Sequence, residues 1–268
     1  MKKIFSAFLF CQLFVWLPVL AIAQNDTAGY FISFDKTKIY YEVKGSGRPV
    51  LLIHGFTGNA GDWKGKPLYD SLLANGFKVI LIDLRGNGHS DKPTVATAYA
   101  NDAEAKDITG LLKFLEIKKY YALGYSRGSI ILARLLVLNK NCSRAVIGGM
   151  GPDFTNPLWP RRIGFYNALM NDTIKGYEGF RKYIAGKGLN PLVLACQQKE
   201  QPSTSKKELA TITQQVLIIC GNEDADNGKG TDLQPLIAYS KFISVPGNHN
   251  NTAASVAFAV QALAFLKL

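Results

Sequence analysis

The chain has 268 residues, of which 47% are hydrophobic and 19% charged, a composition typical of an ordinary globular protein. Its formal net charge is +11, but the lysines are scattered and no nucleic-acid-binding motif accompanies them. We therefore interpret the basic residues as solvated surface and expect no nucleic-acid partner. The cysteines show no metal-ligand spacing, so a metal site has no support.

The first 23 residues have the organisation of a secretory signal peptide. Residues 1–3 are basic, residues 4–20 are uncharged and mostly apolar, and residues 21–23 form an A-x-A-like cleavage signal. The alternative is a retained membrane anchor, which the short apolar stretch disfavours. We therefore predict an exported protein, periplasmic or secreted, without a stable membrane anchor after cleavage. Its oligomeric state is not indicated.

Removal of the first 23 residues leaves 245, enough for one large α/β domain with a substantial core. Loss of Lys2 and Lys3 lowers the formal charge from +11 to +9. The mature part keeps three cysteines, so at most one disulfide can form within it and one thiol remains unpaired.

Extended and helical segments alternate along the mature chain. Runs at residues 29–34 and 39–43 flank a polar turn and predict a β-hairpin. Short apolar runs, of the kind found in strands buried on both faces, follow at residues 50–53, 79–82, 120–123, 145–147, 216–219 and 242–245. Helices are predicted at residues 66–75, 102–115, 129–139 and 253–266. This order predicts an α/β fold with a mostly parallel, eight-stranded twisted sheet flanked by helices.

One segment, at about residues 152–205, interrupts this alternation. It has no convincing strand, contains five prolines, and is too long for a plain connection. Its aromatic and apolar residues favour a helical insertion, a short lid over the site, and disfavour a disordered loop. We therefore expect a single domain over residues 24–268 that carries this lid.

The pentapeptide at residues 124–128, Gly-Tyr-Ser-Arg-Gly, follows a predicted strand and precedes a predicted helix. It has the form G-x-S-x-G, in which the serine occupies a strained turn with its hydroxyl exposed above the sheet edge. The glycines are needed because a side chain at either position would crowd the turn. Ser126 is therefore the predicted nucleophile, and its hydroxyl needs a base.

Of the three histidines in the chain, only His249 follows Ser126. Hydrolases built on this turn place the acid and then the histidine after the serine, so His249 is the predicted base. His54, at the end of a predicted strand, is expected to form local hydrogen bonds instead.

A carboxylate must orient the imidazole, and several are available. The turn after residues 216–219 holds Glu223, Asp224 and Asp226. We prefer Asp224, three residues past a glycine, with Asp226 as the next candidate, and we expect Glu223 to face solvent. Asp153, after the preceding predicted strand, is a further alternative.

Acyl transfer also needs donors for the developing oxyanion. The backbone N–H of Arg127, directly after the nucleophile, is one candidate. The N–H of Phe56 is the other, because the glycines beside it let the backbone approach a ligand. These groups need no cofactor.

Five segments carry a family resemblance: residues 54–56, residues 83–90, the serine pentapeptide, Gly221 with Asp224, and residues 247–249. In this order the chain resembles the α/β-hydrolase fold superfamily, and specifically its small serine-nucleophile branch with a lid between strands six and seven. The resemblance covers nearly the whole mature chain.

The resemblance implies a triad of Ser126, Asp224 and His249, with the Phe56 and Arg127 amides as the oxyanion hole. It also implies that residues 83–90 form a structural loop, so that His89 is not catalytic.

Two departures from relatives matter for function. Dehalogenase and epoxide-hydrolase members carry aspartate at this turn, so Ser126 argues for acyl transfer through an ester intermediate. Arg127 stands where a small or apolar residue is common, and its contact with an anionic substrate is a hypothesis. Four aromatic residues are candidates for an apolar acyl pocket: Trp63, Trp159, Phe165 and Tyr166. The alternative is that they are ordinary core residues.

We expect a hydrolase of small-molecule carboxylic esters (EC 3.1.1), esterase- or lipase-like. A lactone, an amide or a carbon–carbon bond beside a carbonyl would use the same groups. Two alternatives stay open: a cofactor-free perhydrolase or haloperoxidase-like enzyme, and a non-catalytic ligand-binding protein that kept the fold.

Overall fold

The structure is a computed structural model that describes residues 26–268. The predicted signal peptide, residues 1–23, lies outside the described residues. Within that described range, no helix is both long and apolar enough to cross a lipid bilayer.

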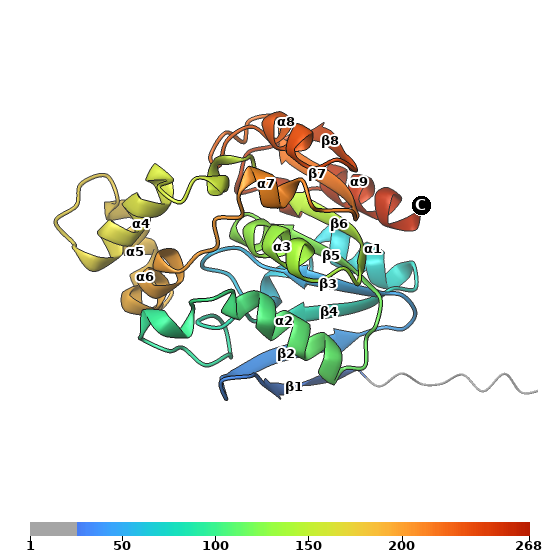
Figure 1. Ribbon diagram of the computed structural model, residues 1–268, viewed down its shortest axis with the longest axis horizontal. Helices are drawn as coiled ribbons and strands as arrows, with labels where there is room; N and C mark the ends of the chain where they lie inside the picture. Colours follow the sequence, from blue (N-terminus) through green and yellow to red (C-terminus); the bar gives the residue numbers. More distant parts are fainter. Residues whose placement is uncertain (1–25) are drawn as a thin grey trace, which may run out of the picture.

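One sheet of eight strands organises residues 26–268, in the order β1-β2-β4-β3-β5-β6-β7-β8 (Figure 1). β2 pairs antiparallel with both β1 and β4, and all other neighbours are parallel. The mostly parallel, eight-stranded α/β sheet predicted from the apolar runs is therefore confirmed. The strands are β1 (Thr27–Ile32), β2 (Lys38–Lys44), β3 (Pro49–Ile53), β4 (Lys78–Ile82), β5 (Tyr120–Tyr125), β6 (Cys142–Gly148), β7 (Gln215–Gly221) and β8 (Ser240–Val245).

Helices cover both faces of the sheet. On one face α1 (Pro67–Ala74) packs against α9 (Val256–Lys267), and on the other α2 (Ala103–Phe114) packs against α3 (Arg127–Leu138). The short α7 (Lys206–Leu209) contacts α3, and α8 (Gly230–Leu233) contacts β7. Single 3₁₀ turns are formed by Ala60–Trp63, Ala96–Ala98, Asp153–Thr155, Gln234–Leu236 and Thr252–Ala254.

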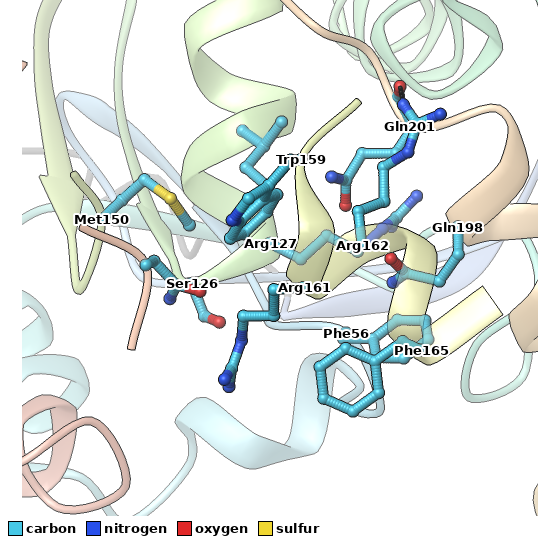
Figure 2. Close-up of a pocket in the computed structure, with 12 residues that line it drawn as sticks. Phe56, Ser126, Arg127, Met150, Trp159, Arg161, Arg162, Phe165, Gln198 and Gln201 are labelled. Atoms are coloured by element: carbon cyan, nitrogen blue, oxygen red, sulfur yellow. Dashed lines mark hydrogen bonds between the residues drawn. The ribbon is translucent and has the colours of Figure 1, made fainter. Parts of the chain in front are cut away.

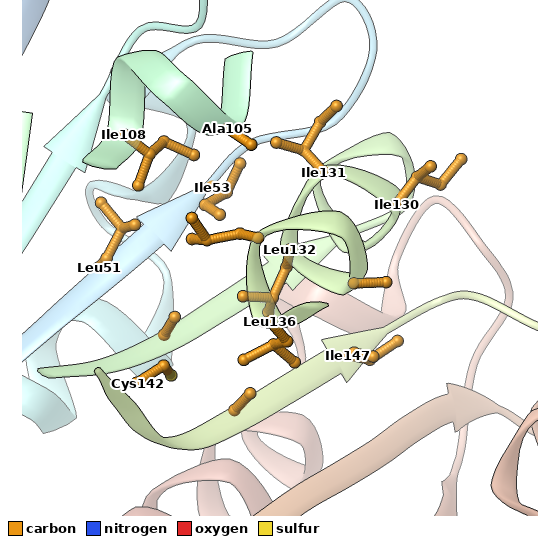
Figure 3. Close-up of a cluster of buried hydrophobic side chains, with 14 of the residues drawn as sticks. Leu51, Ile53, Ala105, Ile108, Ile130, Ile131, Leu132, Leu136, Cys142 and Ile147 are labelled. Atoms are coloured by element: carbon orange, nitrogen blue, oxygen red, sulfur yellow. The ribbon is translucent and has the colours of Figure 1, made fainter. Parts of the chain in front are cut away.

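The side chains of β3 show why its run is apolar throughout. Leu51 and Ile53 enter the core beneath α2 and α3 (Figure 3), whereas Val50 and Leu52 enter the core beneath α1 and α9. All four are fully buried. Because successive strand residues point to opposite faces, a strand covered on both sides has no position for a polar side chain.

Ahead of α7, the segment between β6 and β7 forms three helices: α4 (Pro160–Met170), α5 (Glu178–Gly186) and α6 (Pro191–Lys199). They stand beside the sheet at one end of the molecule, coloured yellow to orange in Figure 1. α4 packs against α6, and the insertion has its own small apolar cluster around Leu169, Ile184 and Leu194. The segment that broke the strand–helix alternation is therefore helical in the structure.

Candidate active site

Ser126 lies at the junction between β5 and α3 in a backbone conformation that non-glycine residues rarely adopt, with φ 55° and ψ −125°. Such strain costs about 1–3 kcal/mol and persists only where the surroundings enforce it. Here the Ser126 N–H donates to the Gly148 carbonyl at 2.9 Å. The Ser129 hydroxyl lies 2.8 Å from this carbonyl oxygen and from that of Gly124, and its single proton bonds to one or is shared between them. These bonds tie the turn to β5 and β6.

The two glycines of the pentapeptide allow backbone segments to cross at close range. A Cβ atom on Gly124 would lie 2.3 Å from the Gly128 carbonyl oxygen, and one on Gly128 would lie 2.4 Å from that of Ile53. Both contacts are with backbone, which cannot move aside cheaply. The sequence argument for these glycines therefore has a direct steric basis.

Gly128→Ala is expected to lower the free energy of unfolding by about 3 kcal/mol or more, because the new methyl group overlaps the end of β3. Urea unfolding followed by circular dichroism measures the effect. Gly179→Ala in α5 is the matched control: its Cβ meets open space, so we expect stabilisation by about 0.4–1 kcal/mol. Equal effects of the two substitutions would contradict the steric argument.

A continuous hydrogen-bonded chain joins the serine, the histidine and an acid. His249 Nε2 lies 2.8 Å from Ser126 Oγ. On the other side of the ring, His249 Nδ1 lies 3.1 and 3.0 Å from the two carboxylate oxygens of Asp224. With Nδ1–H donating to this carboxylate, Nε2 is left as the acceptor of the serine proton. The side chains of His249 and Asp224 are 13% and 2% exposed, so bulk water barely reaches them.

The imidazole is also held through its backbone. The Tyr125 hydroxyl donates to the His249 carbonyl at 2.7 Å, and the two rings pack with centroids 5.5 Å apart. Burial raises the pKa of Tyr125, so this hydroxyl stays protonated and keeps donating. The residue before the nucleophile thus positions the loop that carries the base.

The alternative acids lie elsewhere. Asp226 forms an ion pair with Arg161 at 2.9 Å, and Glu223 and Asp153 are exposed. Of the four candidate carboxylates, the structure brings Asp224 to the imidazole.

The proposed oxyanion donors belong to the loop after β3 and to the first turn of α3. A Cβ on Gly55 would lie 3.5 Å from Ser126 Cβ, so the backbone leading into Phe56 runs close to the nucleophile. Across residues 26–268, neither the Phe56 N–H nor the Arg127 N–H donates to another group. Both donors are therefore free for a ligand.

The loop that carries Phe56 is fixed from behind. The Asn87 side-chain amide donates to the Phe56 carbonyl at 3.0 Å and to the Gly58 carbonyl at 2.9 Å. Gln197 of α6 in turn donates to Asn87 Oδ1 at 2.5 Å. Asn87 was not singled out in the sequence, although it lies within residues 83–90.

The other two histidines form hydrogen bonds or ion pairs elsewhere and do not contact the Ser126 hydroxyl. His54 Nδ1 donates to the Gly55 carbonyl at 2.7 Å, and His54 Nε2 accepts from the Leu84 N–H at 3.1 Å. Burial lowers the pKa of His54, which matches a neutral ring with one donor and one acceptor nitrogen. The His89 side chain is 72% exposed, 3.4 Å from the buried carboxylate of Asp83.

Ser126 opens into a cavity of about 100 Å³ between α3 and the insertion (Figure 2). A wider groove lies on the outer side of the same serine, and His249 lines it. The inner cavity is apolar at Phe56, Ile130, Met150, Trp159 and Phe165. Its polar lining consists of Arg127, Arg161, Arg162, Gln198, Gln201 and Asn227.

Two of the four predicted pocket aromatics, Trp159 and Phe165, line this cavity, and two do not. Trp63 is 2% exposed in the core beneath α1 and α9, where the Lys66 ammonium lies 5.0 Å from its ring centroid. Tyr166 packs against the small core of the insertion. The structure therefore places Trp63 in the main core and Tyr166 at the edge of the insertion's apolar cluster, outside the lining of this cavity.

The pocket is also more polar than expected from the sequence. Arg161 and Arg162, on α4, belong to the predicted helical insertion, where nothing in the sequence marks these two basic residues as facing the site. Gln198 follows an apolar run in α6, and Gln201 lies two residues beyond the end of that helix. Two buried glutamines around a helix end were the available signal.

Arg127 does not present a free charge to the cavity. Its guanidinium donates to both carboxylate oxygens of Glu104, at 2.8 and 2.6 Å, and the two side chains are 3% and 4% exposed. The hypothesis that Arg127 meets an anionic substrate loses its basis, because Glu104 already neutralises this cation.

The chain matches the sequence model of a family described as alpha/beta hydrolase fold over residues 48–186, just over half of its length. Together with the eight-stranded sheet, this places the protein in the α/β-hydrolase fold family.

Named relatives include non-heme haloperoxidases, an epoxide hydrolase and a fluoroacetate dehalogenase. The non-heme chloroperoxidase of Streptomyces lividans is 34% identical over 108 residues, which are 40% of this chain and 38% of that protein. The match to the first curated relatives spans only 38–44% of the length of those proteins.

Two solved structures share the fold. The esterase EaEST of Exiguobacterium antarcticum has a TM-score of 0.74 and 23% identity, and a bromoperoxidase of Bacillus anthracis has a TM-score of 0.74 and 24% identity. Each comparison covers 90% of this chain and 100% of the other. At these identities the likeness concerns the fold alone.

Proposed function

We propose that this protein is a serine hydrolase that cleaves a carboxylic ester, or a related acyl bond, of a small molecule through an acyl-enzyme on Ser126. The observation that carries the proposal is the 2.8 Å contact from His249 Nε2 to Ser126 Oγ on a strained strand-to-helix turn. A strained nucleophile with a base in hydrogen-bonding distance is the arrangement that acyl transfer needs.

In the proposed mechanism, His249 takes the serine proton as Oγ attacks the acyl carbonyl. The N–H groups of Phe56 and Arg127 bind the oxyanion, and each such donor is worth about 3–4 kcal/mol of barrier. His249 then gives the proton to the leaving alcohol, and activates a water that releases the acyl group. Asp224 holds the Nδ1–H tautomer and stabilises the imidazolium.

The insertion and the leader have proposed roles as well. Because Trp159 and Phe165 come from the insertion and line the cavity, we propose that α4–α6 form a lid over the substrate. We also propose that residues 1–23 direct export, which N-terminal sequencing of the protein from its native host would test.

A second candidate function is a perhydrolase, in which hydrogen peroxide replaces water at the acyl-enzyme. The names of the chloroperoxidase and bromoperoxidase relatives favour it. Both functions need the same acyl-enzyme, so they differ only in the second nucleophile.

The test is a panel of p-nitrophenyl esters of increasing acyl length, run beside peracid formation from acetate and hydrogen peroxide. We expect ester hydrolysis by the wild type with a preference for short acyl chains, because the inner cavity is small. Faster peracid formation than ester hydrolysis would favour the perhydrolase. Failure of a fluorophosphonate to label Ser126 would favour a non-catalytic binding protein.

A further inference from the structure

The cavity beside Ser126 contains polar groups that the folded chain leaves unpaired. Gln198 and Gln201 are only 4% and 6% exposed, and both line the cavity. Within the described part of the chain, neither side-chain amide has a hydrogen-bond partner. The amide atoms of both residues are open to the cavity and are not sealed inside the protein, so water or a ligand there must supply their hydrogen bonds. Two such amides facing one cavity indicate a ligand with hydrogen-bonding atoms.

A cation lies beside these amides. Arg162 Nη1 donates to the Gln201 carbonyl and to the Ser203 hydroxyl, at 3.2 Å each. Both partners are neutral, and none of the carboxylates in residues 26–268 lies within ion-pair distance of this guanidinium. Burial lowers the pKa of Arg162, and the more distant Glu200 offsets this in part. The group stays charged at neutral pH, because an arginine side chain hardly ever loses its proton.

The neighbouring cations are already balanced. Arg127 is paired with Glu104 at 2.6 Å, and Arg161 with Asp226 at 2.9 Å. Of the three arginines that line the cavity, Arg162 is therefore the one whose charge a ligand can neutralise.

The nucleophile and the polar groups lie at opposite sides of the cavity. Figure 2 shows Ser126 on one side of the cavity and Arg162, Gln198 and Gln201 on the other, with Trp159 between them. The space is about 100 Å³. A cavity of about 150 Å³ takes benzene, so this one takes about four or five non-hydrogen atoms. An acyl chain that starts at Ser126 can therefore be only a few atoms long before it meets the polar end.

We propose that this cavity binds a short acyl group that ends in a carboxylate, which pairs with Arg162 and accepts hydrogen bonds from the amides of Gln198 and Gln201. The inference rests on the proposed acyl transfer at Ser126 and names its substrate class: monoesters of short dicarboxylic acids. In a succinate monoester, the ester carbonyl lies at the serine, two methylenes pass Trp159, and the free carboxylate reaches the arginine. Hydrolysis consumes one water and releases the alcohol, the dicarboxylate and one proton.

The test compares monomethyl succinate with methyl 4-methylpentanoate, in which an isopropyl group of the same shape replaces the carboxylate. We expect kcat/KM of the wild type to be about tenfold or more higher for the acidic ester, because the neutral one leaves the polar groups unpaired. Arg162→Gln is expected to lower kcat/KM by about thirtyfold for the acidic ester, mainly through KM, and by less than about threefold for the neutral ester. A pH-stat follows both reactions.

Two further variants control for charge and for folding. Arg162→Lys keeps the positive charge without the planar fork, so part of the preference is expected to remain. Arg181→Gln removes a charge from α5, where Arg181 pairs with Glu178, and is expected to leave the ratio unchanged. Equal kcat/KM for the two esters, or an unchanged ratio in Arg162→Gln, would overturn the inference and leave the hydrolase proposal standing.

A binding measurement separates the two proposals. Succinate is expected to raise the Tm of Ser126→Ala by several degrees, and to have no effect on Ser126→Ala/Arg162→Gln. If the wild type hydrolyses neither ester and no fluorophosphonate labels Ser126, the proposed hydrolysis fails, and Arg162-dependent succinate binding would still support the anion site. Absence of that binding would overturn the site itself.

Discussion

Ser126→Ala is expected to lower kcat for the best p-nitrophenyl ester by about four to six orders of magnitude. The reason is geometric: no other hydroxyl can take its place 2.8 Å from His249 Nε2 on the strained turn. Initial rates with purified enzyme measure the loss, and an unchanged Tm shows that the fold is kept. Residual activity within about tenfold of the wild type would contradict the acyl-enzyme.

The triad members are expected to act as a unit. His249→Ala lowers kcat by a similar amount, and the double variant with Ser126→Ala loses little more, because each substitution removes the same step. Asp224→Asn is expected to cost about 10⁴ in kcat by favouring the wrong tautomer. Asp226→Asn is the control, since Asp226 pairs with Arg161. A larger loss in Asp226→Asn than in Asp224→Asn would show that the acid was wrongly assigned.

Glu104→Leu is expected to lower the free energy of unfolding by about 3–5 kcal/mol, because it leaves the Arg127 guanidinium buried without a counter-charge. The pair is bidentate, with both side chains almost fully buried, so solvent cannot replace the lost carboxylate. Urea denaturation measures the change. Activity is expected to fall as well, since Arg127 also supplies an oxyanion N–H.

The double variant Glu104→Leu/Arg127→Met is the decisive control. Replacing a whole buried pair by apolar groups is often neutral or stabilising, so most of the lost stability is expected to return. Lys44→Gln, which breaks an exposed pair with Asp26, is expected to cost less than about 1 kcal/mol. A double variant as unstable as Glu104→Leu would mean that shape, rather than charge, decides this position.

Features set by local sequence were predictable. The apolar run at residues 50–53 suited a strand buried on both faces, and β3 covers Pro49–Ile53. Residues 102–115 gave one apolar face, and α2 runs over Ala103–Phe114. Chain order alone selected His249, and the structure brings it to Ser126. These inferences needed only periodicity, steric limits at glycine and the order of three residues.

Features set by contacts between distant segments were not predictable. An aromatic residue fills a core or a pocket equally well by composition, and Trp63 fills a core. The charge at Arg127 looked available because its partner, Glu104, lies 23 positions away on another helix. The sequence of the insertion indicated helices but not which side of each helix faces Ser126. Arg162 and Gln198 were therefore not recognised as cavity residues.

Adjacent residues of α6 have two different tasks. Gln198 lines the cavity, and Gln197 bonds to Asn87, which holds the Phe56 carbonyl. Any ligand that pushes α6 outward therefore also shifts the amide that must meet the oxyanion. Catalytic rate is sensitive to displacements of about 1 Å at such a group. Substrate discrimination by this protein is consequently expected in kcat as much as in KM. An acyl group that fits poorly still binds, but the Phe56 amide is then displaced from the oxyanion.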